Sequence, residues 1–496
     1  MPLKLDLDTY SAEAERFVGA MDREYYLHFA GHKQALEIET IYERHRSLFE
    51  RQAVDELREE LDRTGPGDER RRVRYLLELA AGGLMGAATK AEETALAERE
   101  ATLEIEIDGR REAYRQSSVI QANEPDPERR AEIERARLEL LEAELNPLHV
   151  AMTERVHGLA RELGWASYRA MCQELKGIDL GDLAGQTSAF SGATAPEYRE
   201  RVEPALRKQT GRGFDALRRS DLPFFFRAPT YDRLFPAERL MEAFERTLAG
   251  LGIVLSAQAN VTLDTEQRPR KSPRAFCSPV HVPNEVYLVI PRVGGRDDFA
   301  ALFHEGGHTE HYANVDPALS FEFRHLGDNS VTEAFAFLLE HLTEDEHWLR
   351  LVLGIEEPGE YVAYARASKL IFLRRYAAKL AYELEVHGGE RSLAEMPGLY
   401  ARLLGEAVGV DWPEVTYLSD VDPGFYAANY LRAWAFETHL RGLLHDQYGP
   451  EWFMRREAGD FLRSLWREGQ RLDADELLQQ VAGGRLDFAV MLNEVG

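Results

Sequence analysis

Residues 303–311 read Phe-His-Glu-Gly-Gly-His-Thr-Glu-His, a pattern that joins two histidines and a glutamate at helical spacing. If the segment is a helix, His304 and His308 lie one turn apart and both imidazoles project from the same face. Two neutral imidazoles placed in this way can share one zinc ion. Glu305 lies beside them, where a carboxylate can accept a proton from a water molecule that the metal activates. The spacing therefore predicts a zinc centre with Glu305 as its general base.

The residues that precede this motif favour a helix. Asp297 and Asp298 place negative charge in its first turn, and an apolar face follows from Phe299 onward. Gly306 and Gly307 each cost a helix roughly 1 kcal/mol relative to alanine. Their presence predicts that the helix backbone approaches another group closely, with a substrate as one candidate. The alternative to the zinc centre is a surface helix with two solvated histidines.

The composition describes an acidic, globular chain. Its 496 residues are 44% hydrophobic and 10% aromatic, and the formal net charge is −26. This charge argues against nucleic acid or an anionic membrane as a partner. The two cysteines, Cys172 and Cys277, provide no disulfide framework, which is typical of a reducing compartment.

The expected location of the protein is the cytoplasm. Residues 1–8 lack the basic region and apolar run of a signal peptide. No stretch reaches about 18 uninterrupted apolar residues, so we expect no membrane span.

The N-terminal half reads as mainly helical. Residues 64–68, Thr-Gly-Pro-Gly-Asp, predict a turn between two helices. Residues 103–107 alternate apolar side chains with glutamates and run into Asp108 and Gly109, a pattern that predicts a strand entering a hairpin turn. The alternative is a helix with one charged face. Asp126 and Pro127 predict the start of a further helix that ends near residues 146–147.

A short extended region precedes the zinc-binding motif. Residues 286–290 are rich in β-branched side chains and lie between Pro283 and Pro291, which indicates a strand. A terminal proline suits an edge strand, whose free backbone groups could pair with an extended substrate. An ordinary buried strand is the alternative.

A third metal ligand is needed, because a catalytic zinc ion usually takes three protein ligands and keeps one position for water. A third histidine six residues after His308 is excluded, since that position is Asn314. His311 follows His308 by three residues and points partly away, so we expect at most an indirect role for it. The acidic candidates downstream are Glu310, Glu322, Asp328, Glu333 and Glu340. Glu333 is favoured, because it lies in the first turn of an apolar helix that can present it rigidly.

Two alternatives to Glu333 as a ligand follow from its neighbours. Ser330 and Glu333 match a capping box, in which the glutamate merely accepts a backbone N–H. Asp328 is a rival ligand, or an acceptor for the N–H of a ligating histidine.

The complete pattern resembles the thimet oligopeptidase and oligoendopeptidase F family of zinc peptidases. His304-Glu305-x-x-His308 is followed by Glu333 after 25 residues (333 − 308). The resemblance extends over residues 261–437, and over the N-terminal half by helical character alone. The stretches that carry it outside the motif are Asp264, Lys271, residues 275–277, residues 373–379 and residues 382–385.

This resemblance implies a mainly α fold with two lobes around a deep channel, which admits short peptides and excludes folded proteins. A small β-sheet is expected beside the metal-binding helix. We predict an N-terminal helical lobe over residues 1–180 and a catalytic lobe over residues 181–496. The family pattern implies one zinc ion per chain, bound by His304, His308 and Glu333.

The resemblance also assigns candidate substrate-binding residues to a later segment. Tyr426 and Tyr430 resemble family tyrosines that hold the substrate and stabilise the developing oxyanion. Two departures are visible: no histidine lies between residues 420 and 424, and Arg432 replaces a further tyrosine. The alternative is that Tyr426 and Tyr430 are ordinary core aromatics, since buried tyrosines are common. The other candidates of this kind are Tyr417 and His325.

The sequence therefore predicts a zinc-dependent metalloendopeptidase that cleaves short, unfolded peptides, with no nucleic-acid or membrane partner. It predicts no particular oligomeric state. One alternative is a zinc-dependent amide hydrolase for a specialised small substrate, motivated by the two departures. The other is a non-catalytic scaffold that binds zinc or peptides, which an intact glutamate beside the two histidines disfavours.

Overall fold

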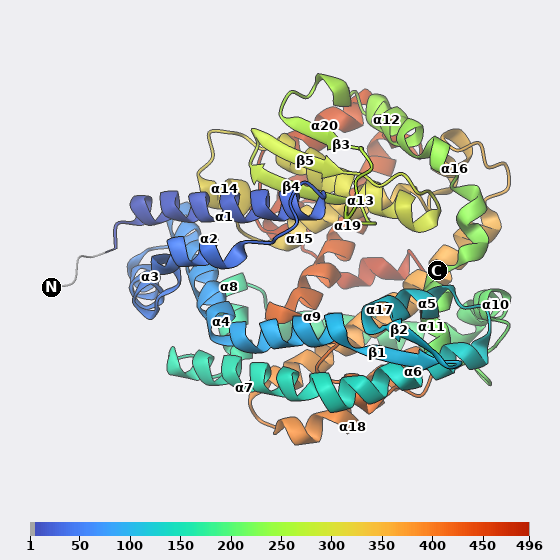
Figure 1. Ribbon diagram of the computed structural model, residues 1–496. Coiled ribbons are helices and arrows are strands. Elements are labelled where there is room, and N and C mark those ends of the chain that lie inside the picture. The colour runs from blue at the N-terminus through green and yellow to red at the C-terminus, as the bar shows by residue number, and fades with distance from the viewer. Residues whose placement is uncertain (1–4, 496) are drawn as a thin grey trace. The chain divides into compact units, whose positions relative to one another are not determined.

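Helices dominate the part of the chain that the computed structural model describes, residues 5–495 (Figure 1). Residues 1–4, on which the signal-peptide prediction partly rests, lie outside the described residues. The strands form one two-stranded and one three-stranded sheet within the described residues. The predicted fold class, mainly α with a small β-sheet, is confirmed.

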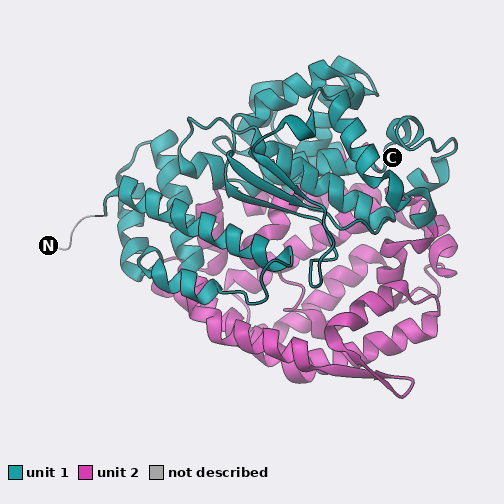
Figure 2. Cartoon of the chain, turned by 45° about the horizontal axis from the view of Figure 1, so that its top comes forward, with its two compact units in different colours: residues 1–83, 231–362, 432–490 teal, residues 84–230, 363–431, 491–496 magenta. Residues whose placement is uncertain are grey.

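The chain divides into two compact units (Figure 2). Unit 1 contains residues 1–83, 231–362 and 432–490, and unit 2 contains residues 84–230, 363–431 and 491–496. Each unit is therefore assembled from three separate stretches of sequence. The boundary predicted near residue 180 falls inside unit 2.

Unit 1 contains the predicted zinc-binding motif, residues 303–311. Its strands are β3 (Val261–Asp264), β4 (Phe276–His281) and β5 (Glu285–Val289). Its α-helices are α1 (Leu7–Phe29), α2 (Ile38–Arg44), α3 (Arg51–Arg63), α12 (Leu240–Gly250), α13 (Arg296–Ala313), α14 (Phe321–His325), α15 (Asn329–Leu342), α16 (Glu346–Leu351), α20 (Arg456–Trp466) and α21 (Ala474–Ala482).

Unit 2 is helical apart from the hairpin of β1 (Glu104–Ile107) and β2 (Arg110–Ala113). Its α-helices are α5 (Tyr114–Asn123), α6 (Pro127–Leu140), α7 (Asn146–Glu162), α8 (Tyr168–Lys176), α9 (Leu180–Thr194), α10 (Tyr198–Thr210), α11 (Leu222–Arg227) and α18 (Met396–Val408). Within the described residues, three α-helices contain residues of both units: α4 (Asp68–Thr102), α17 (Gly359–Gly388) and α19 (Tyr426–Tyr448).

The three-stranded sheet has the order β3-β5-β4, with β5 parallel to β3 and antiparallel to β4. Val289, near the end of β5, pairs with Asp264 on one side and with Phe276 on the other. The strand predicted at residues 286–290 thus exists, but it is the central strand. Its interpretation as an edge strand is wrong, and the alternative of an ordinary buried strand holds.

Helix α13 carries residues 303–311 and packs against β4 and β5 (Figure 1). The backbone enters it through Gly295, which has a φ of 90°. Asp298 in the first turn accepts hydrogen bonds from the N–H groups of Val293 (3.1 Å) and Gly294 (2.8 Å). The buried face of the helix includes Phe299, as the apolar pattern predicts.

The two glycines of the motif allow close helix packing. A Cβ atom on Gly307 would lie 2.5 Å from the Cα atom of Ala336 and 2.5 Å from the carbonyl oxygen of Phe335, both on α15. A Cβ atom on Gly306 would lie 2.4 Å from the ring of Phe244 on α12. The expected close approach is real, but its partners are neighbouring helices, so a substrate is not needed to explain these glycines.

In unit 2, the predicted hairpin is confirmed. β1 and β2 pair antiparallel, and Asp108 (φ 52°) and Gly109 (φ 72°) form the turn. Asp126 caps α6, as predicted, by accepting the N–H of Glu128. The predicted end near residues 146–147 is wrong: the chain continues through a π-helical turn, Leu141–Leu145, into α7. Pro147 is tolerated because the first turn of a helix needs no N–H from it.

No helix in the described part of the chain combines the length and the apolar character that crossing a membrane requires.

Candidate metal centre

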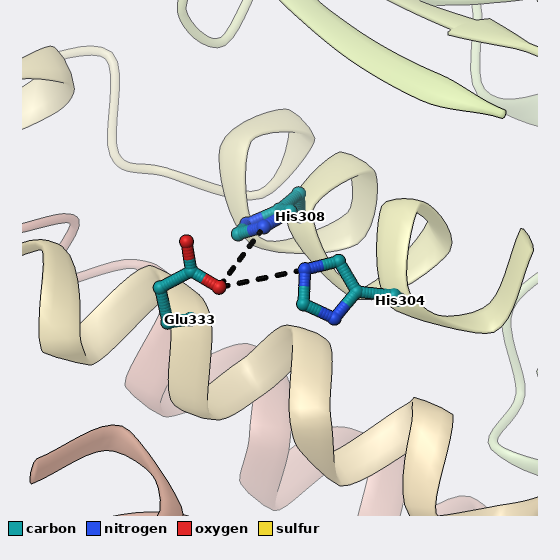
Figure 3. A group of neighbouring side chains, drawn as sticks. All are labelled: His304, His308 and Glu333. Atoms are coloured by element: carbon teal, nitrogen blue, oxygen red, sulfur yellow. Dashed lines mark ion pairs between the residues drawn. The ribbon is translucent and has the colours of Figure 1, made fainter. Parts of the chain in front are cut away.

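Three side chains with metal-binding atoms converge between α13 and α15 (Figure 3). His304 and His308 lie one turn apart on α13, with ring centroids 4.9 Å apart and planes at 82°. From α15, Oε2 of Glu333 lies 3.4 Å from Nε2 of His304 and 3.7 Å from Nε2 of His308. The structure thus brings together the three ligands predicted from the sequence.

These separations fit a zinc ion. Ligand atoms about 2.1 Å from a tetrahedral zinc ion lie roughly 3.4 Å from one another. The two measured separations, 3.4 and 3.7 Å, are close to this value. Two imidazole nitrogens and one carboxylate oxygen are also a donor set found in catalytic zinc sites, which keep one position open.

The second nitrogen of each histidine has its own partner. Nδ1 of His304 lies 2.8 Å from Oε2 of Glu340, and Nδ1 of His308 lies 2.8 Å from the hydroxyl of Thr332. We assign the proton of each ring to Nδ1, because a carboxylate can only accept and a hydroxyl can accept. Both Nε2 lone pairs then face Glu333. Partners of this kind fix the ring orientation of metal-binding histidines.

The two histidines have opposite pKa shifts. Burial lowers the pKa of His308 to about 4, and the neighbouring His304 adds to this effect. Burial also acts to lower the pKa of His304, but the carboxylates of Glu333 and Glu340 outweigh it and hold that pKa well above its usual value. The ring of His308 is therefore neutral at physiological pH. His304 attracts a proton for the same electrostatic reason that it would attract a metal cation.

Glu305 is fixed by the sheet beside the helix. Its Oε2 accepts the backbone N–H of Cys277, on β4, at 2.8 Å. Burial raises the pKa of Glu305 to about 7, although the charge of His304 and the N–H of Cys277 act to lower it. A carboxylate with a pKa near neutrality is suited to accept a proton and to release it again.

The start of α15 speaks against the two alternatives to Glu333 as a ligand. The helix is capped by Asp328, whose Oδ1 accepts the N–H of Ser330 at 2.9 Å. Ser330 lies within the helix, so it is not the first residue of a capping box. Asp328 bonds to the backbone and to Arg432 (3.0 Å), and it does not belong to the histidine group.

The remaining polar candidates point elsewhere. Nε2 of His311 lies 3.3 Å from the carbonyl oxygen of Gly469, so this ring faces away from the metal group. Glu310 accepts a hydrogen bond from Gln258 (2.9 Å). His325 pairs with Asp22 at 3.2 Å.

Tyr426 and Tyr430 belong to unit 2, whereas the metal group belongs to unit 1. They lie one turn apart at the start of α19, half-buried, with ring centroids 4.9 Å apart. The turn before them contains Gly424 (φ 64°) and Phe425 (φ 57°), and the N–H of Gly424 donates to the hydroxyl of Tyr168 at 3.1 Å. Their role in catalysis stays a prediction.

Three contacts of the centre were not predicted from the sequence. They are the hydroxyl of Thr332, the carboxylate of Glu340 as the partner of His304, and the backbone N–H of Cys277. A signal existed for Glu340, which follows Glu333 by two helical turns and therefore shares its face. No signal existed for Cys277, because its contribution comes from the backbone.

Replacing Glu340 should weaken zinc binding. Without its carboxylate, the ring of His304 loses the acceptor that orients it, so we expect Glu340→Ala to reduce zinc affinity by about 10- to 100-fold. The measurement is competition for zinc with a chelator. Glu344→Ala is the matched control, because Glu344 pairs with Arg296 (3.5 Å). Equal zinc affinity in both variants would show that Glu340 does not support the site.

Comparisons with known proteins agree with the fold. No family model and no curated protein matches this sequence. Among solved structures, the chain is similar to a protein from Bacillus anthracis str. Ames that is described as a putative oligoendopeptidase F. The TM-score is 0.67 and the sequence identity is 16%. The match covers 97% of this chain and 88% of that chain. At this identity the likeness establishes that the two chains share a fold.

Proposed function

We propose that the protein is a zinc-dependent metallopeptidase that hydrolyses peptide bonds in short, unfolded peptides. The observation that carries this proposal is the group of His304, His308 and Glu333 beside a buried Glu305 whose orientation a backbone N–H fixes. The shared fold with a solved structure described as an oligoendopeptidase F supports the choice of a peptide as substrate.

In the proposed reaction, His304, His308 and Glu333 hold the zinc ion. A bound zinc ion supplies Lewis-acid activation of water and of the scissile carbonyl. Glu305 accepts the proton of the attacking water on its carboxylate and then delivers it to the nitrogen of the leaving amine. The raised pKa of Glu305, about 7, suits both halves of this transfer.

We further propose that a phenol from Tyr426 or Tyr430 donates a hydrogen bond to the carbonyl oxygen as negative charge develops on it. A donor of this kind contributes roughly 3 kcal/mol to transition-state stabilisation. The half-buried state of both rings leaves part of each side chain accessible to a ligand.

The competing candidate is an amide hydrolase for a specialised small substrate. The observation that favours it is the environment of Arg432, which replaces a family tyrosine. Its guanidinium is bound by Asp328 (3.0 Å) and Asp475 (2.7 Å), so it is engaged inside unit 1. With arginine at position 432, the chain lacks one of the phenols that the family pattern provides.

A comparison of substrates separates the two candidates. We expect the zinc-loaded protein to cleave members of a mixed library of short peptides and to leave small non-peptide amides intact. The products are read by mass spectrometry. A folded protein with exposed loops is the control and should stay uncut. Cleavage of small amides without cleavage of peptides would replace the proposal with the competing candidate.

A further inference from the structure

Asp328 forms the first link between the metal ligand Glu333 and a distant helix. The Asp328 side chain, 3% exposed, begins α15, where its Oδ1 accepts the N–H of Ser330. Its Oδ2 accepts two further hydrogen bonds, from the backbone N–H of Ala474 (3.1 Å) and from the guanidinium of Arg432 (3.0 Å). The carboxylate thus joins the first turns of α15 and α21.

Arg432 supplies the positive charge at this junction. It lies on α19 with a side chain only 10% exposed, and its second terminal nitrogen contacts Asp475 of α21 at 2.7 Å. A buried carboxylate is costly unless a cation or several donors compensate it. Removal of the guanidinium would leave Asp328 with backbone N–H groups alone. The cap of α15 therefore depends on Arg432.

The residues that follow this cap belong to the metal centre. Thr332, the partner of His308, and Glu333, the third ligand, come four and five residues after Asp328. This part of a helix depends on its cap, because the first N–H groups have no intrahelical acceptor. The far half of α15 is held differently, by the contact of Gly307 with Ala336. Loss of the cap should therefore displace Thr332 and Glu333 before it displaces Glu340.

We propose that Arg432 is a positioning residue for the metal ligand Glu333, acting through the Asp328 carboxylate that begins α15. This inference rests on the proposed zinc site and adds a residue that contacts neither the metal ligands nor their hydrogen-bond partners. Arg432 orders the side of the centre formed by Glu333 and Thr332. Glu340 and His304 are held without it.

The first test measures zinc affinity of the full-length protein by competition with a chelator. Arg432→Met keeps the apolar stem and removes the charge, and we expect it to weaken zinc binding about tenfold, as loss of an outer partner does. Arg432→Lys restores the positive charge and should recover part of the affinity. Recovery should be incomplete, because one ammonium cannot reach both carboxylates as a guanidinium does. Arg441→Met is the matched control. Arg441 lies on the same helix, α19, and its guanidinium pairs with Glu437 (2.6 Å).

The second test asks whether the effect passes through Glu333. In a Glu333→Ala background, zinc is left with the two histidines. Arg432→Met should then weaken binding clearly less than in the wild type, because only the contact of Thr332 with His308 is left for it to disturb. An equal loss in both backgrounds would show a general effect on the fold and would overturn the proposal. If Arg432→Met does not fold, Asp328→Asn replaces it and should show the same dependence on Glu333.

Hydrogen exchange of the zinc-free protein separates this inference from the proposed function. Arg432→Met should speed exchange in residues 329–333 and leave residues 336–342 unchanged, because the two halves of α15 are held independently. Unchanged exchange at residues 329–333 would contradict the positioning role. Failure of the wild type to bind zinc would instead contradict the proposed function, and the exchange result would still show whether Arg432 orders α15.

Discussion

Glu305→Gln should lower kcat for peptide cleavage by about a thousandfold, within the range by which a positioned acid–base group accelerates a reaction. Glutamine is nearly the same size as glutamate, and its carbonyl oxygen can still accept the N–H of Cys277, which the carboxylate now accepts at 2.8 Å. The variant loses the ability to take a proton and keeps the shape of the site. The measurement is steady-state kinetics at matched zinc occupancy.

Zinc content distinguishes this result from a damaged site. Because Glu305 is not one of the three converging side chains, Glu305→Gln should bind one zinc ion per chain with the affinity of the wild type. Full activity in this variant would remove Glu305 from the mechanism. Loss of zinc together with activity would show that Glu305 contributes to metal binding.

His308→Ala should lose its zinc on dialysis and with it the activity, because the two remaining ligands bind the ion only weakly. The ring of His308 is neutral because burial lowers its pKa to about 4, so its Nε2 lone pair is available to a cation. Its removal leaves one imidazole and one carboxylate, fewer than the three protein ligands that a catalytic zinc ion usually takes. The measurement is zinc stoichiometry after dialysis, by elemental analysis.

The control for this variant is His347→Ala, which removes an exposed histidine from α16 in the same unit. It should keep the zinc content and activity of the wild type. Stoichiometric zinc in His308→Ala would exclude His308 from the centre.

Much of the candidate metal centre could be predicted, because two of its three side chains are close together in the sequence. His304 and His308 are separated by one helical turn, and any helix there places them on one face. Glu333 was harder to assign, since its sequence neighbourhood also matched a capping box. The structure resolves the ambiguity through Asp328, which caps α15 itself and leaves Glu333 to face the histidines.

Two of the errors share a physical cause, which is dependence on partners far away in the sequence. Gly306 and Gly307 signal close packing, but only the structure shows that Phe244 and Ala336 are the partners. The strand at residues 285–289 has the composition of a strand, but its central place depends on β3 and β4. Pro147 normally ends a helix, yet a π-helical turn places it in the first turn of the next one.

The boundaries of the two units could not be predicted from sequence patterns, for a related reason. Composition changes little near the residues where the chain passes from one unit to the other. Two of these places, near residues 83 and 431, lie inside α4 and α19, and no turn signal marks them. A helix that contains residues of both units has the same periodicity throughout.

The most direct test of the proposed function is cleavage of a mixed short-peptide library by the zinc-loaded wild type beside Glu305→Gln. Mass spectrometry of the products reports both the cleavage and its sequence preference. We predict cleavage by the wild type and about a thousandfold slower cleavage by the variant. If neither protein cleaves any peptide although both hold zinc, the protein is not a peptidase of this kind.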